Sequence, residues 1–171
     1  MAYVTVSELK RYLGIDSENV TDDALLADMV QRAQAVVNTF TRRTFETAGD
    51  ETRAHGWGLV DGTCLFLDGD LCAVTSVVNG DGSALRAADY YTMPRNRAPF
   101  YALQLRPTVG YTWDGATGDI LVTGRWAYSL TPPADVVQAT VRLAAWLYRQ
   151  KDNTGADSPM LAGDTMILPS R

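Results

Sequence analysis

The sequence predicts an α+β protein: a helical core of a short helix, a long helix and a C-terminal helix, with an inserted antiparallel β-sheet or small barrel and an extended C-terminal tail. Two observations predict this class. Apolar residues recur at helical spacing near both ends, and between them short β-branched and aromatic runs are separated by glycines. The expected divisions are a single domain over residues 1–151, made of a helical part at 1–48, a β insertion at 49–130 and a helix at 131–151, and then the tail at 152–171.

The short helix is predicted from a capping box. In Thr5-Val6-Ser7-Glu8 the Thr5 hydroxyl and the Glu8 carboxylate can each accept a hydrogen bond from the other residue's free amide. Val4 and Leu9 are spaced to form a hydrophobic staple, and Gly14 supplies a left-handed stop. At about nine residues this helix is too short to persist alone in water, so we expect it to pack on the core.

The long helix is expected from Asp22 to about Arg42. Thr21 is placed to cap it, and Asp22 and Asp23 put negative charge at the positive end of the helix dipole. Its apolar residues recur at helical spacing and predict one buried stripe. The stripe consists of Leu26, Met29, Val30, Ala33, Val37 and Phe40.

The C-terminal helix is expected over residues 131–151. Pro132 and Pro133 fall in its first turn, where a missing amide hydrogen removes no helical hydrogen bond. Its predicted buried stripe consists of Val136, Val137, Thr140, Leu143, Ala144, Leu147 and Tyr148.

The β insertion is predicted to hold short strands. Asn79-Gly80-Asp81-Gly82 indicates a hairpin turn, because such turns need residues that accept positive φ. Short strands favour a compact antiparallel sheet or a small barrel. The expected strands are Thr52–Trp57, Thr63–Leu67, Ala73–Val78, Tyr90–Met93, Tyr101–Leu105 and Ile120–Tyr128.

Composition excludes several classes of protein. The chain has 171 residues, of which 46% are apolar and 20% charged, as in globular domains and unlike disordered or collagen-like chains. Its net charge of −5 argues against a charge-driven nucleic-acid binder. No apolar run approaches the roughly 20 residues of a membrane span, and the first residues do not resemble a secretory signal. Two cysteines favour a reducing compartment over a disulfide framework.

The residues that could carry chemistry do not converge in the sequence. His55 is the only histidine, and we expect a structural histidine whose hydrogen bonds are satisfied. Cys64 and Cys72 fit neither a zinc site nor a redox motif and are expected to be small buried apolar side chains. Asp68-Gly69-Asp70 is expected in a solvated turn, since Gly-Asp clusters are typical of turns, although two carboxylates can also bind a metal. We therefore predict no enzyme activity, no cofactor and no metal site.

Charge is unevenly distributed along the chain. Residues 49–92 carry seven acids and two arginines, a net of −5, whereas residues 93–113 carry three arginines and no acid. One interpretation is an ordinary solvated surface. The other is a head-to-tail contact in a ring, in which the acidic loops of one subunit meet the arginines of the next. The candidate interface residues are Arg95, Arg97, Arg106, Asp68 and Asp70.

Several segments resemble one family. Tyr3-Val4-Thr5-Val6-Ser7-Glu8-Leu9-Lys10-Arg11-Tyr12-Leu13-Gly14-Ile15 resembles the opening of head–tail connector, or head completion adaptor, proteins of long-tailed bacteriophages. Asp23-Ala24-Leu25-Leu26, Thr41-Arg42-Arg43-Thr44-Phe45 and Val122-Thr123-Gly124-Arg125-Trp126-Ala127-Tyr128-Ser129 are similar to later parts of that family. The resemblance covers about residues 3–46 and 120–150, and residues 50–118 match only as the β insertion of larger members.

The resemblance implies a structural protein of the virion neck. Such adaptors form a ring, expected to be a dodecamer, that joins the portal protein to a stopper or tail-terminator protein and extends the DNA channel. DNA would pass without sequence-specific binding, because a negative channel wall repels phosphates. The expected location is the virion neck, reached from the host cytoplasm during assembly, with no membrane contact.

The tail and the tryptophans carry two further expectations. The tail cannot bury its apolar residues alone, so we expect it to fold on a partner, with the portal as the candidate. Its docking candidates are Met160, Leu161, Met166, Ile167 and Leu168. The alternative functions are a stopper or tail-terminator neck protein, or a carbohydrate- or host-binding β module that uses Trp57, Trp113 or Trp126.

Overall fold

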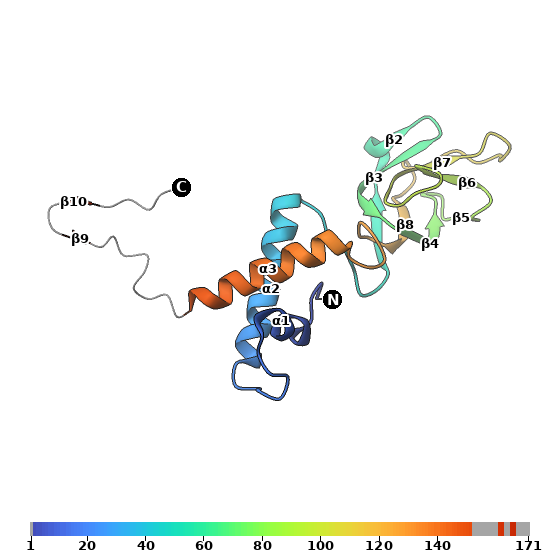
Figure 1. Cartoon of the computed structure of the whole chain (residues 1–171). Helices are drawn as coiled ribbons and strands as arrows, with labels where there is room; N and C mark the ends of the chain where they lie inside the picture. The colour runs from blue at the N-terminus through green and yellow to red at the C-terminus, as the bar shows by residue number, and fades with distance from the viewer. Residues whose placement is uncertain (1, 152–160, 163–164, 167–171) are drawn as a thin grey trace. The chain divides into compact units, whose positions relative to one another are not determined.

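A computed structural model describes residues 2–151, 161–162 and 165–166 (Figure 1). The predicted α+β class is confirmed: three α-helices accompany two four-stranded antiparallel sheets, and the described strands close no barrel. The chain divides into two compact units. A β unit spans residues 37–137, and a helical unit combines residues 2–36 with residues 138–151. Helices from the two ends of the sequence therefore share one unit, as the sequence predicted.

Helix α1 (Val6–Leu13) has the predicted capping box. The Glu8 amide donates to Thr5 Oγ1 at 3.2 Å, and the Thr5 amide donates to Glu8 Oε2 at 2.8 Å. Gly14 adopts the left-handed conformation at φ 73° and ends the helix. Val4 and Leu9 are both buried, so the short helix is held by its apolar side as well as by its cap.

Helix α2 (Asp23–Thr41) begins one residue later than predicted, so Asp22 rather than Thr21 precedes it. Leu26, Met29, Val30 and Ala33 are buried as expected, but Val37 is only half-buried and Phe40 is 88% exposed. The predicted stripe is wrong beyond Ala33. Periodicity identifies the face of a helix that can be buried; it does not say how far along the helix another element covers that face.

Helix α3 (Ala134–Gln150) follows the two prolines, and Thr140 and Ala144 of its predicted stripe are buried. Val141 and Ala145 are also buried, whereas Leu143 and Leu147 are only half-buried. The stripe therefore lies about one residue further along the helix than the sequence indicates.

The first sheet of the β unit has the strand order β1-β8-β4-β5 and the second has the order β2-β3-β7-β6. Six strands were predicted, two of them with correct bounds, and the two missed strands, β2 and β5, have only two residues each. The predicted hairpin turn joins β4 to β5, with Gly82 at φ 83°. The strands are β1 (Glu51–His55), β2 (Val60–Asp61), β3 (Cys64–Leu71), β4 (Ala73–Val78), β5 (Ala84–Leu85), β6 (Tyr90–Met93), β7 (Phe100–Leu105) and β8 (Ile120–Arg125), and a 3-10 turn, η1, spans Trp57–Leu59.

Side chains from both sheets form the core of the β unit, which includes Leu65, Leu71, Val77, Leu103 and Ile120. One prediction fails here. Asp68-Gly69-Asp70 does not form a turn between strands but belongs to β3, at an irregularity between Phe66 and Leu71 in the pairing with β7. A bulge leaves residues unpaired within a continuing strand, so a turn-like composition is accommodated without a reversal of the chain.

The tail falls mostly outside the described residues. Leu161–Ala162 (β9) pairs antiparallel with Thr165–Met166 (β10). Met160, Ile167 and Leu168 lie outside the described residues.

Candidate functional site: three charged hollows of the β unit

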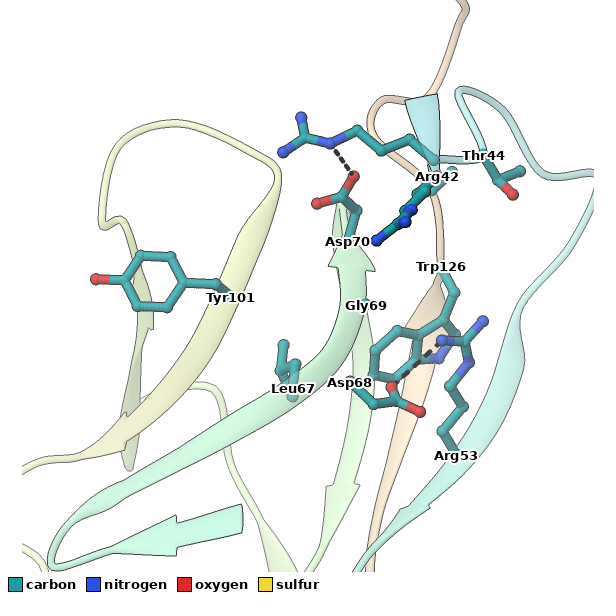
Figure 2. Close-up of a pocket in the computed structure, with 11 residues that line it drawn as sticks. Arg42, Thr44, Arg53, Leu67, Asp68, Gly69, Asp70, Tyr101 and Trp126 are labelled. Carbon is teal, nitrogen blue, oxygen red and sulfur yellow. Dashed lines mark hydrogen bonds and ion pairs between the residues drawn. The ribbon is translucent and has the colours of Figure 1, made fainter. Parts of the chain in front are cut away.

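The first hollow, which we call the arginine–aspartate hollow, measures about 440 Å³ and combines arginines from the end of α2 with the irregular part of β3 (Figure 2). Arg43 Nε lies 3.4 Å from Asp70 Oδ2, and Arg53 Nη1 lies 3.3 Å from Asp68 Oδ1. Burial opposes the charge of Arg53, but its hydrogen bonds to Glu51 and Asp68 outweigh that effect and raise the pKa of the guanidinium. Both aspartates predicted at a subunit interface therefore have an arginine partner within their own chain.

Trp126 lines this hollow and contacts His55, Arg53 and Glu51. Its ring stacks on His55 at a centroid distance of 5.5 Å, and the Arg53 guanidinium lies 4.4 Å from its centroid. Its indole N–H donates to the Glu51 carbonyl at 2.9 Å. Trp126 is 4% exposed, so these contacts are made in a dry setting where cation–π attraction is strongest.

His55 is buried, as predicted for a structural residue, but its hydrogen bonds are not satisfied. It is fully inaccessible, and neither ring nitrogen has a hydrogen-bond partner in the described part of the chain. Nε2 lies 3.6 Å from Asp68 Oδ1, which is too long for a hydrogen bond. Stacking on Trp126 and the nearby carboxylate are the contacts that hold the imidazole.

The second hollow, the arginine–tyrosine hollow, measures about 510 Å³ and lies beside β6. The guanidiniums of Arg95 and Arg106 lie 3.7 Å and 4.1 Å from the centroid of the Tyr91 ring. Arg106 Nε is buried without a hydrogen-bond partner among the described residues. Two of the three arginines predicted at an interface are thus brought together, while Arg97 is exposed in the loop between β6 and β7. No aspartate or glutamate lines this hollow.

The third hollow, the acidic hollow, measures about 280 Å³ and is lined by Asp81, Asp114, Trp57, Tyr111 and Trp113 among others, with no lysine or arginine. Hydrogen bonds from Ser83 to Asp81, and from Thr117 to Asp114, hold the pKa of each carboxyl below its ordinary value. Both groups are therefore ionised at neutral pH, and an acidic, aromatic surface is open to solvent.

Asn79 and Gly80 bring the two acids of this hollow together. The buried Asn79 side chain donates to the Thr112 carbonyl and accepts from the Asp114 amide, each at 2.9 Å. A Cβ on Gly80 would stand 1.8 Å from the Asp114 carbonyl oxygen, so only glycine allows the β4–β5 turn this close to the 114–118 loop.

The remaining predicted residues have structural surroundings. Trp113 is buried and donates its indole N–H to the Thr63 carbonyl at 2.8 Å, so Trp57, at 57% exposed, is the accessible member of the three tryptophans proposed for sugar binding. Cys64 and Cys72 are free thiols that are half-buried rather than buried, and burial raises the pKa of Cys72. Among the described residues, no group of three or more His, Cys, Asp or Glu side chains is placed to hold a metal ion.

Sequence reasoning missed Tyr91, Asp81 and Asp114 as site residues. Their roles depend on which loops meet, and neither acid lies in a pattern that indicates binding. The available signal is the glycine pattern: Gly80, Gly115 and Gly118 all lie where a side chain would collide with the facing backbone. Glycines at such spacing indicate a close approach of two loops.

None of the described helices is both long enough and apolar enough to cross a bilayer. The chain matches no protein-family model and no curated protein.

Solved structures share the fold of the chain. A chain in the neck of an empty gene transfer agent (GTA) particle, computed with C6 symmetry, is 17% identical with a TM-score of 0.60, over 93% of this chain and 84% of that one. A chain in the neck of a native GTA particle, computed with C12 symmetry, is 19% identical with a TM-score of 0.58, over 97% and 91%. A chain of the native GTA virion is 17% identical with a TM-score of 0.57, over 98% and 83%. At these identities the likeness establishes a common fold.

Proposed function

We propose that the chain is an adaptor of a phage-like neck, forming a ring that joins the portal to the stopper or tail and extends the DNA channel. The observation that carries this proposal is the likeness of nearly the whole chain to chains of GTA necks computed with C6 and C12 symmetry. A closed ring needs each copy to present two different, complementary faces. The β unit offers such faces, because one hollow is lined by arginines without acids and another by acids without cations.

The helices favour an adaptor over a stopper or tail terminator. Those alternatives predict a β-dominant fold without the long second helix, whereas α2 has 19 residues and α3 has 17. The net charge of −5 suits a protein that surrounds passing DNA, since a negative wall repels phosphates. An arginine-lined channel in a map of the assembled neck would overturn this part of the proposal.

The tail is proposed to dock on the portal through its apolar residues. Deleting residues 156–171 should abolish portal attachment, measured by co-sedimentation with purified portal rings, while leaving the thermal unfolding midpoint within about 2 °C. In the matched control a Gly/Ser linker of equal length replaces residues 156–171, which separates the loss of the apolar side chains from the loss of tail length. Attachment that survives the deletion would contradict portal docking by the tail and leave the ring proposal standing.

The adaptor role itself is tested by mixing the purified chain with portal rings of the same particle and imaging the product. We expect a closed ring of this chain on the portal. A chain that never joins the portal, and whose fluorescence is quenched by glycans except in Trp57→Phe, would instead favour the carbohydrate-binding alternative.

A further inference from the structure

Two hollows of the β unit have opposite and unmatched charge. The arginine–tyrosine hollow presents two guanidiniums against Tyr91 with no carboxylate in its lining, and the acidic hollow presents two carboxylates with no cation in its lining. The arginine–aspartate hollow is different, because it holds both signs of charge: Asp68 accepts a hydrogen bond from Arg53, and Asp70 Oδ2, which has no hydrogen-bond partner among the described residues, lies within ion-pair distance of Arg43.

Arg106 indicates what the arginine–tyrosine hollow lacks. Its Nε has lost contact with solvent and has no hydrogen-bond partner among the described residues, so a donor is desolvated without an acceptor. Both guanidinium carbons lie over the Tyr91 ring, at 3.7 Å and 4.1 Å from its centroid, and a guanidinium on an aromatic ring can still donate hydrogen bonds from its edge. A carboxylate is the acceptor that matches a guanidinium, because it takes two parallel hydrogen bonds.

A chain is not placed to fill its own hollow. Val74, the second residue of β4, lines the arginine–tyrosine hollow, whereas Asp81 lies three residues beyond the last residue of β4. From Val74 to Val78 alone the strand rises about 13 Å, at roughly 3.3 Å per residue. The turn that carries Asp81 and the Val74 edge of the arginine–tyrosine hollow thus lie at opposite ends of this strand, and a second copy is the natural source of the acceptor.

We propose that the arginine–tyrosine hollow of one copy receives the β4–β5 turn of a neighbouring copy, so that Asp81, with Asp114 beside it, pairs with Arg95 and Arg106. This inference rests on the proposed ring. It assigns the acidic partner to Asp81 and Asp114 in place of Asp68 and Asp70. The same contact covers the exposed Trp57 and Tyr111 at the edge of the acidic hollow, and aromatic side chains of this kind are frequent anchors of protein interfaces.

Charge reversal with rescue tests the contact. Arg95→Glu and Asp81→Arg should each weaken ring assembly at least about tenfold, because each places like charges opposite one another. The double variant carrying both changes restores opposite charges between positions 95 and 81 at every contact, while Arg106 and Asp114 stay as they are. An equimolar mixture of the two single variants does so as well, because an alternating ring pairs each altered face with its complement. Assembly of the full chain, alone and on portal rings, is followed by sedimentation velocity.

The matched controls are Arg86→Glu and Asp61→Arg, which reverse exposed charges of the β unit outside both hollows. We expect wild-type assembly from the controls, loss in the single variants and recovery in the double variant and the mixture. Single variants that assemble like wild type, or a double variant that stays dissociated, would overturn this contact while leaving the ring itself intact. A wild-type chain that forms no ring alone or on the portal would overturn the proposed function as well.

Discussion

The helical unit and the β unit use their cations in different ways. The two lysines of the chain, Lys10 and Lys151, both belong to the helical unit and bind neighbouring aspartates at the start of α2, with Nζ 2.5 Å from Asp23 and 2.6 Å from Asp22. In the β unit the cations are arginines, and several lie on aromatic rings. Each lysine also donates to a second oxygen of its own unit, Lys10 to the Ser17 carbonyl and Lys151 to the Tyr148 hydroxyl, whereas a guanidinium held on a ring keeps donors for another partner. The lysines of the helical unit are thereby engaged internally, whereas the two arginines on Tyr91 in the β unit share a hollow with no carboxylate in its lining.

The largest loss of stability is expected at Trp126, whose contact with Arg53 lies within one chain. Trp126→Ala removes the stack with His55, the ring under Arg53 and the indole donor to Glu51, and should lower the free energy of unfolding by about 3–5 kcal/mol. Urea unfolding followed by circular dichroism measures the change.

Trp57→Ala is the matched control, because Trp57 is 57% exposed, and its effect should stay within about 0.5 kcal/mol. Equal losses in the two variants would show that the buried stack does not stabilise the β unit.

A smaller loss is expected when the lysine fastening α1 to α2 is removed. Lys10 is 5% exposed and also donates to the Ser17 carbonyl at 3.3 Å, so Lys10→Ala should lower the free energy of unfolding by about 1–3 kcal/mol. Arg11→Ala, one residue away and exposed, is the control. If both variants unfold at the same urea concentration, Lys10 does not fasten the helices.

The smallest effect is a pH dependence of the stability that Asp22 contributes at the start of α2. Hydrogen bonds from Lys151 and Tyr148 lower the pKa of Asp22 below its ordinary value of 3.8. The stabilisation is therefore fully present above that ordinary value and is lost as the pH falls through the lower pKa of the folded state. The difference in urea midpoint between wild type and Asp22→Asn should be present at pH 7 and shrink progressively as the pH is lowered below 3.8. A difference that persists unchanged at acid pH would contradict an ionic origin.

Local signals in the sequence predicted the parts of the fold that depend on neighbouring residues. The capping box at Thr5 and Glu8 and the turn at Asn79–Gly82 are settled within a few residues, and both are confirmed. The predictions that Phe40 is buried and that Asp68-Gly69-Asp70 forms a turn are wrong, because burial and strand pairing depend on distant elements. The hollows depend on the same long-range information: Asp81 and Asp114 line one hollow because Asn79 and Gly80 of the turn lie against Asp114 of the other loop.

The interface candidates illustrate this limit. The charge pattern singles out Arg95 and Arg106, which share one hollow and whose place at an interface stays a prediction. Sequence alone could not show that Asp68 and Asp70 have arginine partners in their own chain. Composition identifies the cations and acids that are available, and only the fold determines which of them remain unmatched.

Cryo-electron microscopy of the assembled neck tests the central claim most directly. We expect a closed ring of this chain at the portal, with the β unit of each copy placing Asp81 against Arg95 and Arg106 of the next. A neck that lacks this chain, or a ring whose copies touch only through their helical units, would contradict it.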